Sequence, residues 1–532
     1  MIRQHLAWVP RLCQPCGIRA ALAHGTGLLL TIAAMLAAFV SSLAAQEGAS
    51  GPGAPREAAA NDEAPDEVSF ETLLAAADDA SLLPGNRQSI EPRKFTLRPA
   101  AEAVPALRYQ LLPPFVDRRP GNAAVLYPKL LLEVHHTSLT ELRENIDRWN
   151  ELPIAELPRE EVAAAMLRWR SVLDGLDRAA RCEYCDWQLP LREQPFYEIL
   201  LPEVQAMRQY AKLVAADVRL AIAEGRFDDA LRGLQTGFAI ARHVAAGPTL
   251  VSALVGISIS RTMLARVEEF IQQPAAPNLY WALTSLPRPF IDLRAALEVE
   301  REFLALSLPA AANPPARAEA VLESLRWAVS GSDWPGTAEY LQICLQVYPQ
   351  AKKFLIEQGR TAEEVEALSV RGAMGLYVLA TYERVRDETM KWMYVPYVEA
   401  APQLRLAEAA LYATPENAAV LRLMGGAIPA MSHVYTAQAT LEREVAILRT
   451  LEQMSDYAAQ GGAGRLAHYV RESETLAPTD PMTGEKIRLA SRRETANGEV
   501  EGYFLGVGNR DLSAFGSPDA TPIIVYEIQL AE

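Results

Sequence analysis

The feature that most constrains the fold is a helical spacing of apolar residues, which runs from about residue 121 to residue 460. Apolar side chains recur every three or four residues there, the repeat that places them on one face of an α-helix. Pro202 and Pro248 stand at the start of two such stretches, where a missing backbone N–H costs little, and Gly225 ends the first stretch. A capping box is predicted at Ser138–Glu141 and another at Thr361–Glu364. The pattern predicts a mainly α-helical protein.

Residues 214–244 resemble the turn and second helix of a tetratricopeptide repeat (TPR). Gly225 would make the tight turn, and Ala230, Leu234 and Ala241 would let two helices pack closely. The first-helix positions of the repeat are not matched, and no second copy recurs at a fixed period. We therefore predict an array of antiparallel helical hairpins, TPR-like in part, with a small β-containing C-terminal unit.

The boundaries of this organisation follow from shifts in composition. Residues 46–67 consist largely of Ala, Gly, Pro and acidic residues, which predicts disorder. A long helix at 434–459 precedes two predicted strands, at 502–508 and 521–530. The predicted parts are a signal peptide or signal anchor at 1–45, a disordered linker at 46–67, an irregular lead-in at 68–120, a helical array at 121–310, a second helical region at 311–460 and a β-rich tail at 461–532.

The N-terminus has the three-part order of a membrane-targeting segment. Arg3, Arg11 and Arg19 precede an uncharged apolar run at 27–40, and small residues follow at 42–45. This order predicts a signal peptide cleaved near Ala45. The alternative is an uncleaved anchor, because roughly 20 apolar residues span a bilayer. We therefore expect an exported protein of the periplasm or cell envelope, held at the inner membrane if the segment is retained.

The charge of the chain excludes some partners. It carries 51 Lys and Arg residues against 66 Asp and Glu residues, a net charge of −15. Such a chain repels nucleic acid and anionic headgroups. We expect a protein partner in the envelope, no nucleic acid, and membrane contact only through the N-terminal segment.

Cys182 and Cys185 form the one CxxC pair outside the N-terminal segment. A redox dithiol needs a preceding strand and a following helix, and a zinc site needs a second pair. The favoured interpretation is structural, either a local disulfide or two buried thiols. His243, near the end of a predicted helix, is expected to be a cation stabilised by the helix dipole. No metal, cofactor or catalytic motif is found, so whether the chain is an enzyme stays open, with a non-catalytic role favoured.

One polar cluster is the best candidate for an interaction surface. Aromatic side chains stand beside arginines and an aspartate, residue types that could line an amphipathic site for a peptide or glycan. The alternative is a corner between helices whose aromatic residues fill the core while the ions pair at its rim. The candidate residues are Tyr280, Trp281, Arg288, Asp292 and Arg294.

Two resemblances rest on particular motifs. The run at 275–294, with Cys185-Asp-Trp187 and Pro120-Gly-Asn-Ala123, resembles a family of exported planctomycete proteins over about residues 107–306. That resemblance implies export and helices, but no activity. The motif Asp480-Pro-x-Thr-Gly484 and the glycine-rich stretch at 506–511 look like the C-terminal part of type II secretion pseudopilins. This second likeness is confined to the β unit, because charged residues at 442–444 and 449 interrupt the preceding helix.

These observations favour an exported helical scaffold that binds another protein without catalysis. Two alternatives stay open. One is an envelope-polymer hydrolase that draws its acid and base from carboxylates on facing helices. The other is a membrane-anchored structural protein.

Overall fold

The computed structural model is mainly α-helical with a small sheet, which confirms the prediction of a mainly helical protein with a small β-containing C-terminal unit. The predicted signal segment and linker lie outside the residues that the structure describes. The described residues are 93–100, 103–133, 136–193, 202–302, 306, 320, 322, 337–411, 415–424, 431–461, 478–491, 503–507 and 523–531.

The chain divides into two compact units. One unit comprises residues 90–308, 380–417 and 429–532, and the other comprises 1–89, 309–379 and 418–428. The first division lies close to the boundary predicted at 310. The sequence, however, separates the β-rich tail from the helical array, whereas the structure places both in the larger unit. Helices α16 (Val370–Met390) and α18 (Pro415–Met424) pass from one unit to the other.

In the smaller unit, α14 (Thr337–Glu357) packs against α15 (Ala362–Glu366). Leu355, Val365 and Ala373 form a buried cluster there. The Thr361 hydroxyl accepts the Glu364 N–H, and the Glu364 carboxylate accepts the Thr361 N–H. The capping box predicted at this position is therefore confirmed.

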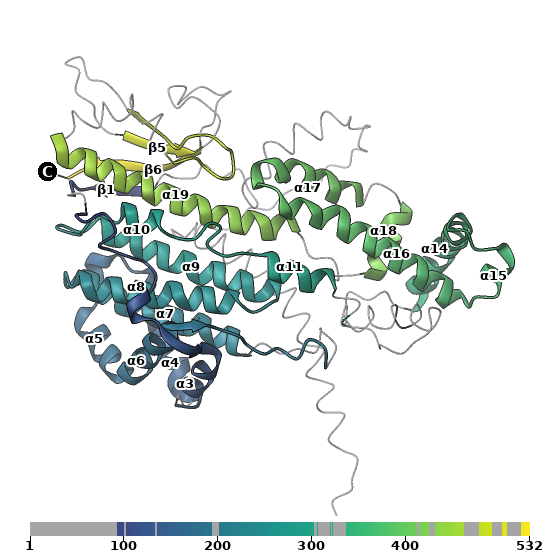
Figure 1. The fold of residues 1–532 in the computed structure, drawn as a ribbon, viewed down its shortest axis with the longest axis horizontal. Helices are drawn as coiled ribbons and strands as arrows, with labels where there is room; N and C mark the ends of the chain where they lie inside the picture. Colours follow the sequence, from purple (N-terminus) through teal and green to yellow (C-terminus); the bar gives the residue numbers. More distant parts are fainter. Residues whose placement is uncertain are drawn as a thin grey trace, which may run out of the picture. The chain divides into compact units, whose positions relative to one another are not determined.

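Three helices form the centre of the larger unit: α7 (Pro202–Ala223), α8 (Phe227–Ala245) and α9 (Leu250–Ile271). Each packs against the other two (Figure 1). Gly225, between α7 and α8, has a φ of 70°, a left-handed conformation that glycine adopts without strain. Shorter helices of the same unit are α3 (Tyr127–Glu133), α4 (His136–Glu151), α5 (Arg159–Arg168), α6 (Arg170–Ala180), α10 (Tyr280–Thr284) and α11 (Arg294–Arg301).

The capping box predicted at Ser138–Glu141 is wrong. Helix α4 begins at His136, so Ser138 already lies inside the helix. The spacing of a capping box also occurs by chance within helices, because serine, threonine and glutamate are tolerated there. Within the predicted helical array, residues 159–180 form two helices, α5 and α6, which meet at Trp169.

Glycine residues allow α8 and α9 to approach closely. A Cβ atom at Gly256 of α9 would lie 2.7 Å from the Ala241 carbonyl oxygen of α8. A Cβ atom at Gly237 of α8 would lie 2.1 Å from the Met263 sulfur. The first contact is with backbone, which cannot move alone, and the second is with a flexible side chain. The two positions should therefore tolerate a methyl group to different degrees.

We expect Gly256→Ala to destabilise the protein by about 1–3 kcal/mol, because the methyl group overpacks the helix contact. Alanine is about 1 kcal/mol better than glycine in an isolated helix, so the sign itself tests the packing. Gly237→Ala is the matched control and should cost less. Thermal unfolding followed by circular dichroism measures both variants, and a Gly256→Ala protein more stable than the parent would contradict this account.

Among the described helices, α9 alone is long and apolar enough to span a membrane by length and composition. Its apolar stretch is 72% buried, and the helix packs against α7, α8 and α19 (Met431–Gly461). Contacts within the protein core therefore account for its apolar character.

The sheet joins both ends of the described chain. Its strand order is β1-β6-β5-β4, with β4, β5 and β6 antiparallel and β1 parallel to β6. The two strands predicted in the tail are confirmed. β1 lies in the region predicted as an irregular lead-in; a run this short has little pattern of its own, and its partner is at the other end of the sequence. The strands are β1 (Arg93–Leu97), β4 (Arg488–Ser491), β5 (Tyr503–Val507) and β6 (Ile523–Leu530).

Helix α19 confirms the long helix predicted at 434–459 and connects the parts of the larger unit. It packs against α9, α10, α17 (Tyr397–Leu411) and β1, and it runs beside the sheet in Figure 1. A second, two-stranded sheet pairs β2 (Arg119–Asn122) with β3 (Cys182–Tyr184). The single-turn 3-10 helices are η1 (Phe115–Asp117), η2 (Ala123–Val125), η3 (Ile154–Glu156) and η5 (Lys391–Tyr394).

Candidate functional site

One face of α19 holds the segment that follows α9. Its four contact residues are spaced by four, seven and three positions, which places them on one side of the helix. They bind mostly backbone groups, so the path of the segment is fixed. The contacts are Gln438 Nε2 donating to the Ile291 carbonyl (2.6 Å), Glu442 accepting the Phe290 N–H (2.7 Å), Arg449 Nε donating to Thr284 Oγ1 (2.9 Å) and Glu452 accepting the Leu279 N–H (2.8 Å).

These four contacts place Tyr280, Trp281 and Arg288 beside Arg449. The Arg449 guanidinium lies 5.5 Å from the centre of the Tyr280 ring, and that ring meets Trp281 edge to face at 5.1 Å. Burial and then the neighbouring charge of Arg288 lower the pKa of Arg449. Trp281 is 37% exposed, and Arg288 is exposed as well. We call these four residues the arginine–aromatic surface.

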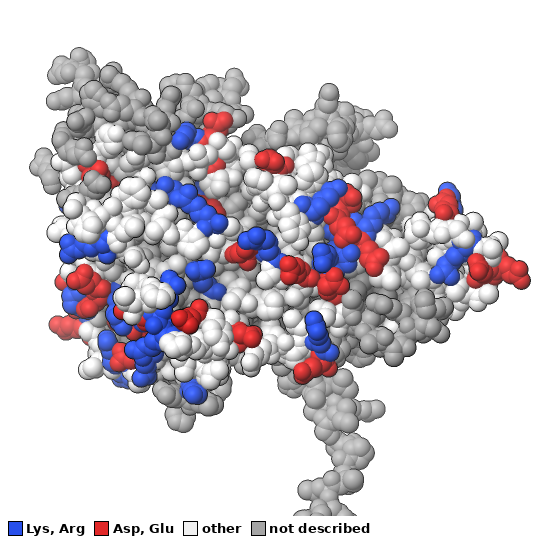
Figure 2. Space-filling model, in the orientation of Figure 1, with Lys and Arg blue, Asp and Glu red and all other residues white. Residues whose placement is uncertain are grey.

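Neither arginine of this surface forms an ion pair with a carboxylate among the described residues. Arg449 contacts the Thr284 hydroxyl and the Tyr280 ring. Glu442 accepts the Phe290 N–H; burial raises its pKa, and the nearby charge of Arg288 opposes that shift. Figure 2 shows Lys and Arg side chains gathered where α10 lies against α19. The site therefore offers guanidinium N–H donors and two aromatic rings to an incoming anionic group.

The other two predicted residues stand apart from this surface. Arg294 binds Asp292 through two nitrogens, at 2.9 and 2.5 Å, and donates its backbone N–H to the same carboxylate. The hydrogen bond from Arg294 lowers the pKa of Asp292. This pair is exposed and its charges neutralise each other. The structure thus brings together three of the five candidate residues and leaves two as a local ion pair.

Sequence reasoning missed Arg449. In the sequence, Arg449 was noted only as one of the charged residues that interrupt the long helix before the β unit. Its spacing from Glu442 and Glu452, seven and three residues, was the available signal, because it places all three on one helix face. What that face meets is more than 150 residues earlier in the sequence.

Cys182 and Cys185 are free thiols in the structure, so the predicted disulfide is not formed there. Cys182 begins strand β3, and three residues of extended chain separate two Cα atoms by roughly 10 Å. A disulfide requires less than about 7 Å. Burial raises the pKa of Cys185 to about 12, which keeps its thiol protonated at neutral pH and makes it a poor nucleophile. The alternative of two thiols, one of them buried, describes this arrangement.

His243 is hydrogen-bonded to the backbone of Cys182. It is not the cation predicted from its position near the end of a helix. Tyr127 Oη lies 2.9 Å from His243 Nδ1, and Trp187 Nε1 donates to the His243 carbonyl at 2.8 Å. Burial lowers the pKa of His243 to about 4, so the ring is neutral at neutral pH. The loss of hydration outweighs the helix dipole, which favours a cation by only about 0.3–1 kcal/mol at an exposed site.

Within the described ranges, no group of three or more His, Cys, Asp or Glu side chains is placed to hold a metal ion. Comparison of the chain with family models, with curated proteins and with solved structures gave no significant match. The function is therefore argued from the arginine–aromatic surface itself.

Proposed function

We propose that this protein is an exported helical scaffold that binds another protein through the arginine–aromatic surface, without catalysis. The observation that carries the proposal is that Arg288 and Arg449 lie near each other beside two aromatic rings, and neither forms an ion pair with a carboxylate in the described part of the chain. Arginine, tyrosine and tryptophan are the residues that most often dominate binding energy at interfaces. A partner segment with a carboxylate next to an apolar side chain has the complementary chemistry.

The proposed framework is an array of antiparallel helical hairpins, TPR-like in part. The left-handed Gly225 turn between α7 and α8 supports it, as does the mutual packing of α7, α8 and α9. Arrays of this kind offer extended binding surfaces. The basic, apolar and then small residues at the N-terminus support export to the periplasm or cell envelope.

The alternative of an envelope-polymer hydrolase needs two carboxylates about 5–10 Å apart that line a cleft. Glu442 and Glu452 are the acidic residues of α19 that contact the segment following α9. Each of them accepts a backbone N–H from that segment. Their oxygens hold the fold together, which favours the scaffold over this alternative. The third candidate is a membrane-anchored structural protein, and a carbonate wash of the membrane fraction distinguishes it from a released one.

A photo-cross-linking amino acid at position 281 tests the proposed function. With benzoylphenylalanine in place of Trp281, we expect one reproducible cross-linked product in cells that express the full chain. Arg288→Gln combined with Arg449→Gln should reduce its yield at least tenfold, because interface arginines commonly contribute more than about 1–2 kcal/mol each.

Two controls make this result specific. Arg294→Gln should leave the cross-linked yield unchanged, since Arg294 is paired with Asp292. The same cross-linker at Leu167 of α5, which is 78% exposed, should not give the product. The proposed function fails if position 281 gives no product, or if the yield is indifferent to Arg288 and Arg449.

A further inference from the structure

Residues 103–125 form a strap that crosses α7 and α8 in Figure 1. Apart from β2, the strap contains only the short turns η1 and η2. Five of the sixteen large apolar side chains that are exposed in the described part of the chain lie in it, which is far more than scattered exposure would give. They are Val104 (77%), Leu107 (60%), Phe115 (79%), Val116 (86%) and Val125 (55%).

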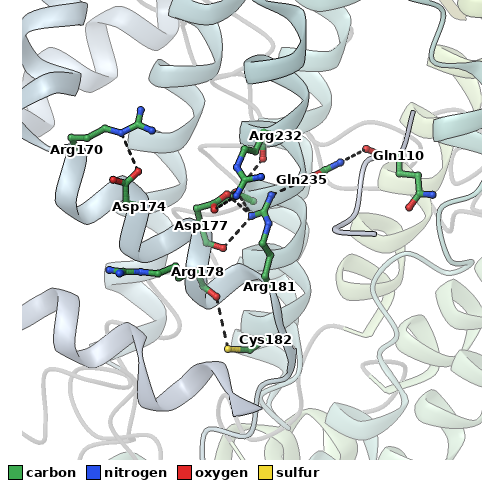
Figure 3. A network of polar contacts seen from close by, with 10 residues as sticks. Gln110, Arg170, Asp174, Asp177, Arg178, Arg181, Cys182, Arg232 and Gln235 are labelled. Atoms are coloured by element: carbon green, nitrogen blue, oxygen red, sulfur yellow. Dashed lines mark hydrogen bonds and ion pairs between the residues drawn. The ribbon is translucent and has the colours of Figure 1, made fainter. Parts of the chain in front are cut away.

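Polar contacts around the buried Arg181 side chain join the strap to the neighbouring helices, and Figure 3 shows Gln235 of α8 bound to Gln110 of the strap. The Arg119 N–H donates to the Arg181 carbonyl at 2.8 Å, and Gln235 Nε2 donates to the Gln110 carbonyl at 3.0 Å. The Arg181 side chain is 2% exposed and binds Asp177 of α6. The strap is therefore held by backbone hydrogen bonds and by the buried Leu111 side chain, while the five apolar side chains named above stay exposed.

Four arginines accompany these apolar side chains: Arg108, Arg118, Arg119 and, from α8, Arg242. None of them forms an ion pair with a described residue. Arg118 Nε donates to the Pro113 carbonyl, and burial and then the charge of Arg118 lower the pKa of Arg242. The acidic residues near the strap include Asp117 within it, Glu183 on β3 and Asp186, whose backbone is hydrogen-bonded to the Asn122 side chain, and all three are exposed. Lys and Arg side chains lie among uncharged and acidic residues where the strap crosses α7 and α8 (Figure 2).

We propose that the strap is a lipid-facing surface, on which Phe115 and Val116 insert at the interface and the arginines bind anionic headgroups. The two apolar residues are neighbours on a single 3-10 turn, η1, and both side chains are more than three-quarters exposed. Buried apolar area and attraction to anionic lipid are the two terms that hold peripheral proteins at membranes. Arginine can place its aliphatic stem at the acyl boundary and its charge among headgroups.

This inference revises the expectation that only the N-terminal segment meets the membrane. The net charge of −15 describes the whole chain, but charges farther away than about 10 Å are screened in salt. The local surface is set by Arg118 and Arg242, which are far apart in the sequence and adjacent in the fold. A lipid surface fits this combination, because separate projecting side chains with flanking arginines do not need a complementary groove.

The test uses the full chain in lipid nanodiscs, with phosphatidylcholine alone or mixed with phosphatidylglycerol. Phe115→Trp adds an emitting ring at the tip of η1, and the signal is the difference from the parent, which has 8 tryptophans. We expect the added emission to be blue-shifted and quenched by lipids brominated on their acyl chains, most strongly with phosphatidylglycerol. Leu345→Trp on α14, at a position 77% exposed, is the matched control and should show neither effect.

A second variant tests the charge term in the same discs. Adding Arg118→Gln and Arg242→Gln to Phe115→Trp should lower the ratio of docked to undocked chains about thirtyfold, since each basic residue near an anionic surface contributes about 1 kcal/mol. The proposal is overturned if the added tryptophan stays open to iodide and unaffected by brominated lipid in both disc types. Shielding from iodide without lipid would also overturn it, because a protein contact would then cover the strap. Any membrane anchor at the N-terminus is common to all variants and cancels.

Discussion

Replacing Arg443 by methionine is expected to lower the free energy of unfolding by about 3–5 kcal/mol. Arg443 Nε and Nη2 bind the two oxygens of Asp480 at 2.9 and 2.7 Å. Asp480 is fully buried and Arg443 is 9% exposed. Methionine fills a similar volume, but it leaves a buried carboxylate without its cation, and this uncompensated charge is the source of the loss.

Denaturant titration of two further variants isolates this term. Arg170→Met removes a surface ion pair with Asp174, in which both side chains are more than half exposed, and should cost about 0–1 kcal/mol. Adding Asp480→Asn to Arg443→Met should recover part of the stability, because the amide oxygen can still accept the Met482 N–H without carrying a charge. Equal losses of stability for Arg443→Met and Arg170→Met would show that the buried ion pair contributes no more than the exposed one.

Stability should fall as the pH rises from about 4.5 to about 8, by up to about 1.4 kcal/mol per pH unit, through Glu452. Burial raises the pKa of Glu452 from 4.5 to about 8, although the hydrogen bond from the Leu279 N–H opposes the shift. In this window the folded carboxyl keeps its proton while the unfolded one releases it. The contribution of Glu452 to the free energy of unfolding is fully present below pH 4.5. It is lost once the pH has risen through the pKa of the folded group.

Glu452→Gln should remove the part of the slope that comes from Glu452, because the amide oxygen still accepts the Leu279 N–H and does not titrate. Burial also raises the pKa of Glu300, to about 7, and its part remains in both proteins. The measurement is the free energy of unfolding by urea at several pH values between 5 and 8, for the variant and the parent.

His243 acts in the opposite sense, because its pKa is lowered to about 4, and it weakens the fold as the pH falls from 6.5. The difference between variant and parent cancels that term. Glu302→Gln, on an exposed side chain, is the control, and parallel pH profiles for Glu452→Gln and the parent would refute the assignment.

The candidate site was only partly predictable from sequence, and Arg288 and Arg294 show why. They lie six residues apart, both basic, both near aromatic or acidic neighbours. Arg294 found its carboxylate two residues away and became an inert ion pair. Arg288 instead came to lie close enough to Arg449 for its charge to lower the Arg449 pKa, because α19 packs against α10. Local sequence encodes residue type, whereas the partner of each charge is set by packing.

The sequence by itself determined what depends on neighbours within a few turns of the chain. Apolar spacing specified the long helices, proline at Pro202 and the Thr361 capping box specified helix starts, and alternation specified β6. These are short-range effects of backbone hydrogen bonding and side-chain periodicity. The tertiary structure decided what depends on long-range contact. It paired β1 with β6, buried His243 as a neutral ring, enclosed Asp480 with Arg443, and placed Arg449 beside Arg288. Each of these outcomes depends on which groups lose water together, and that is settled only when distant segments pack.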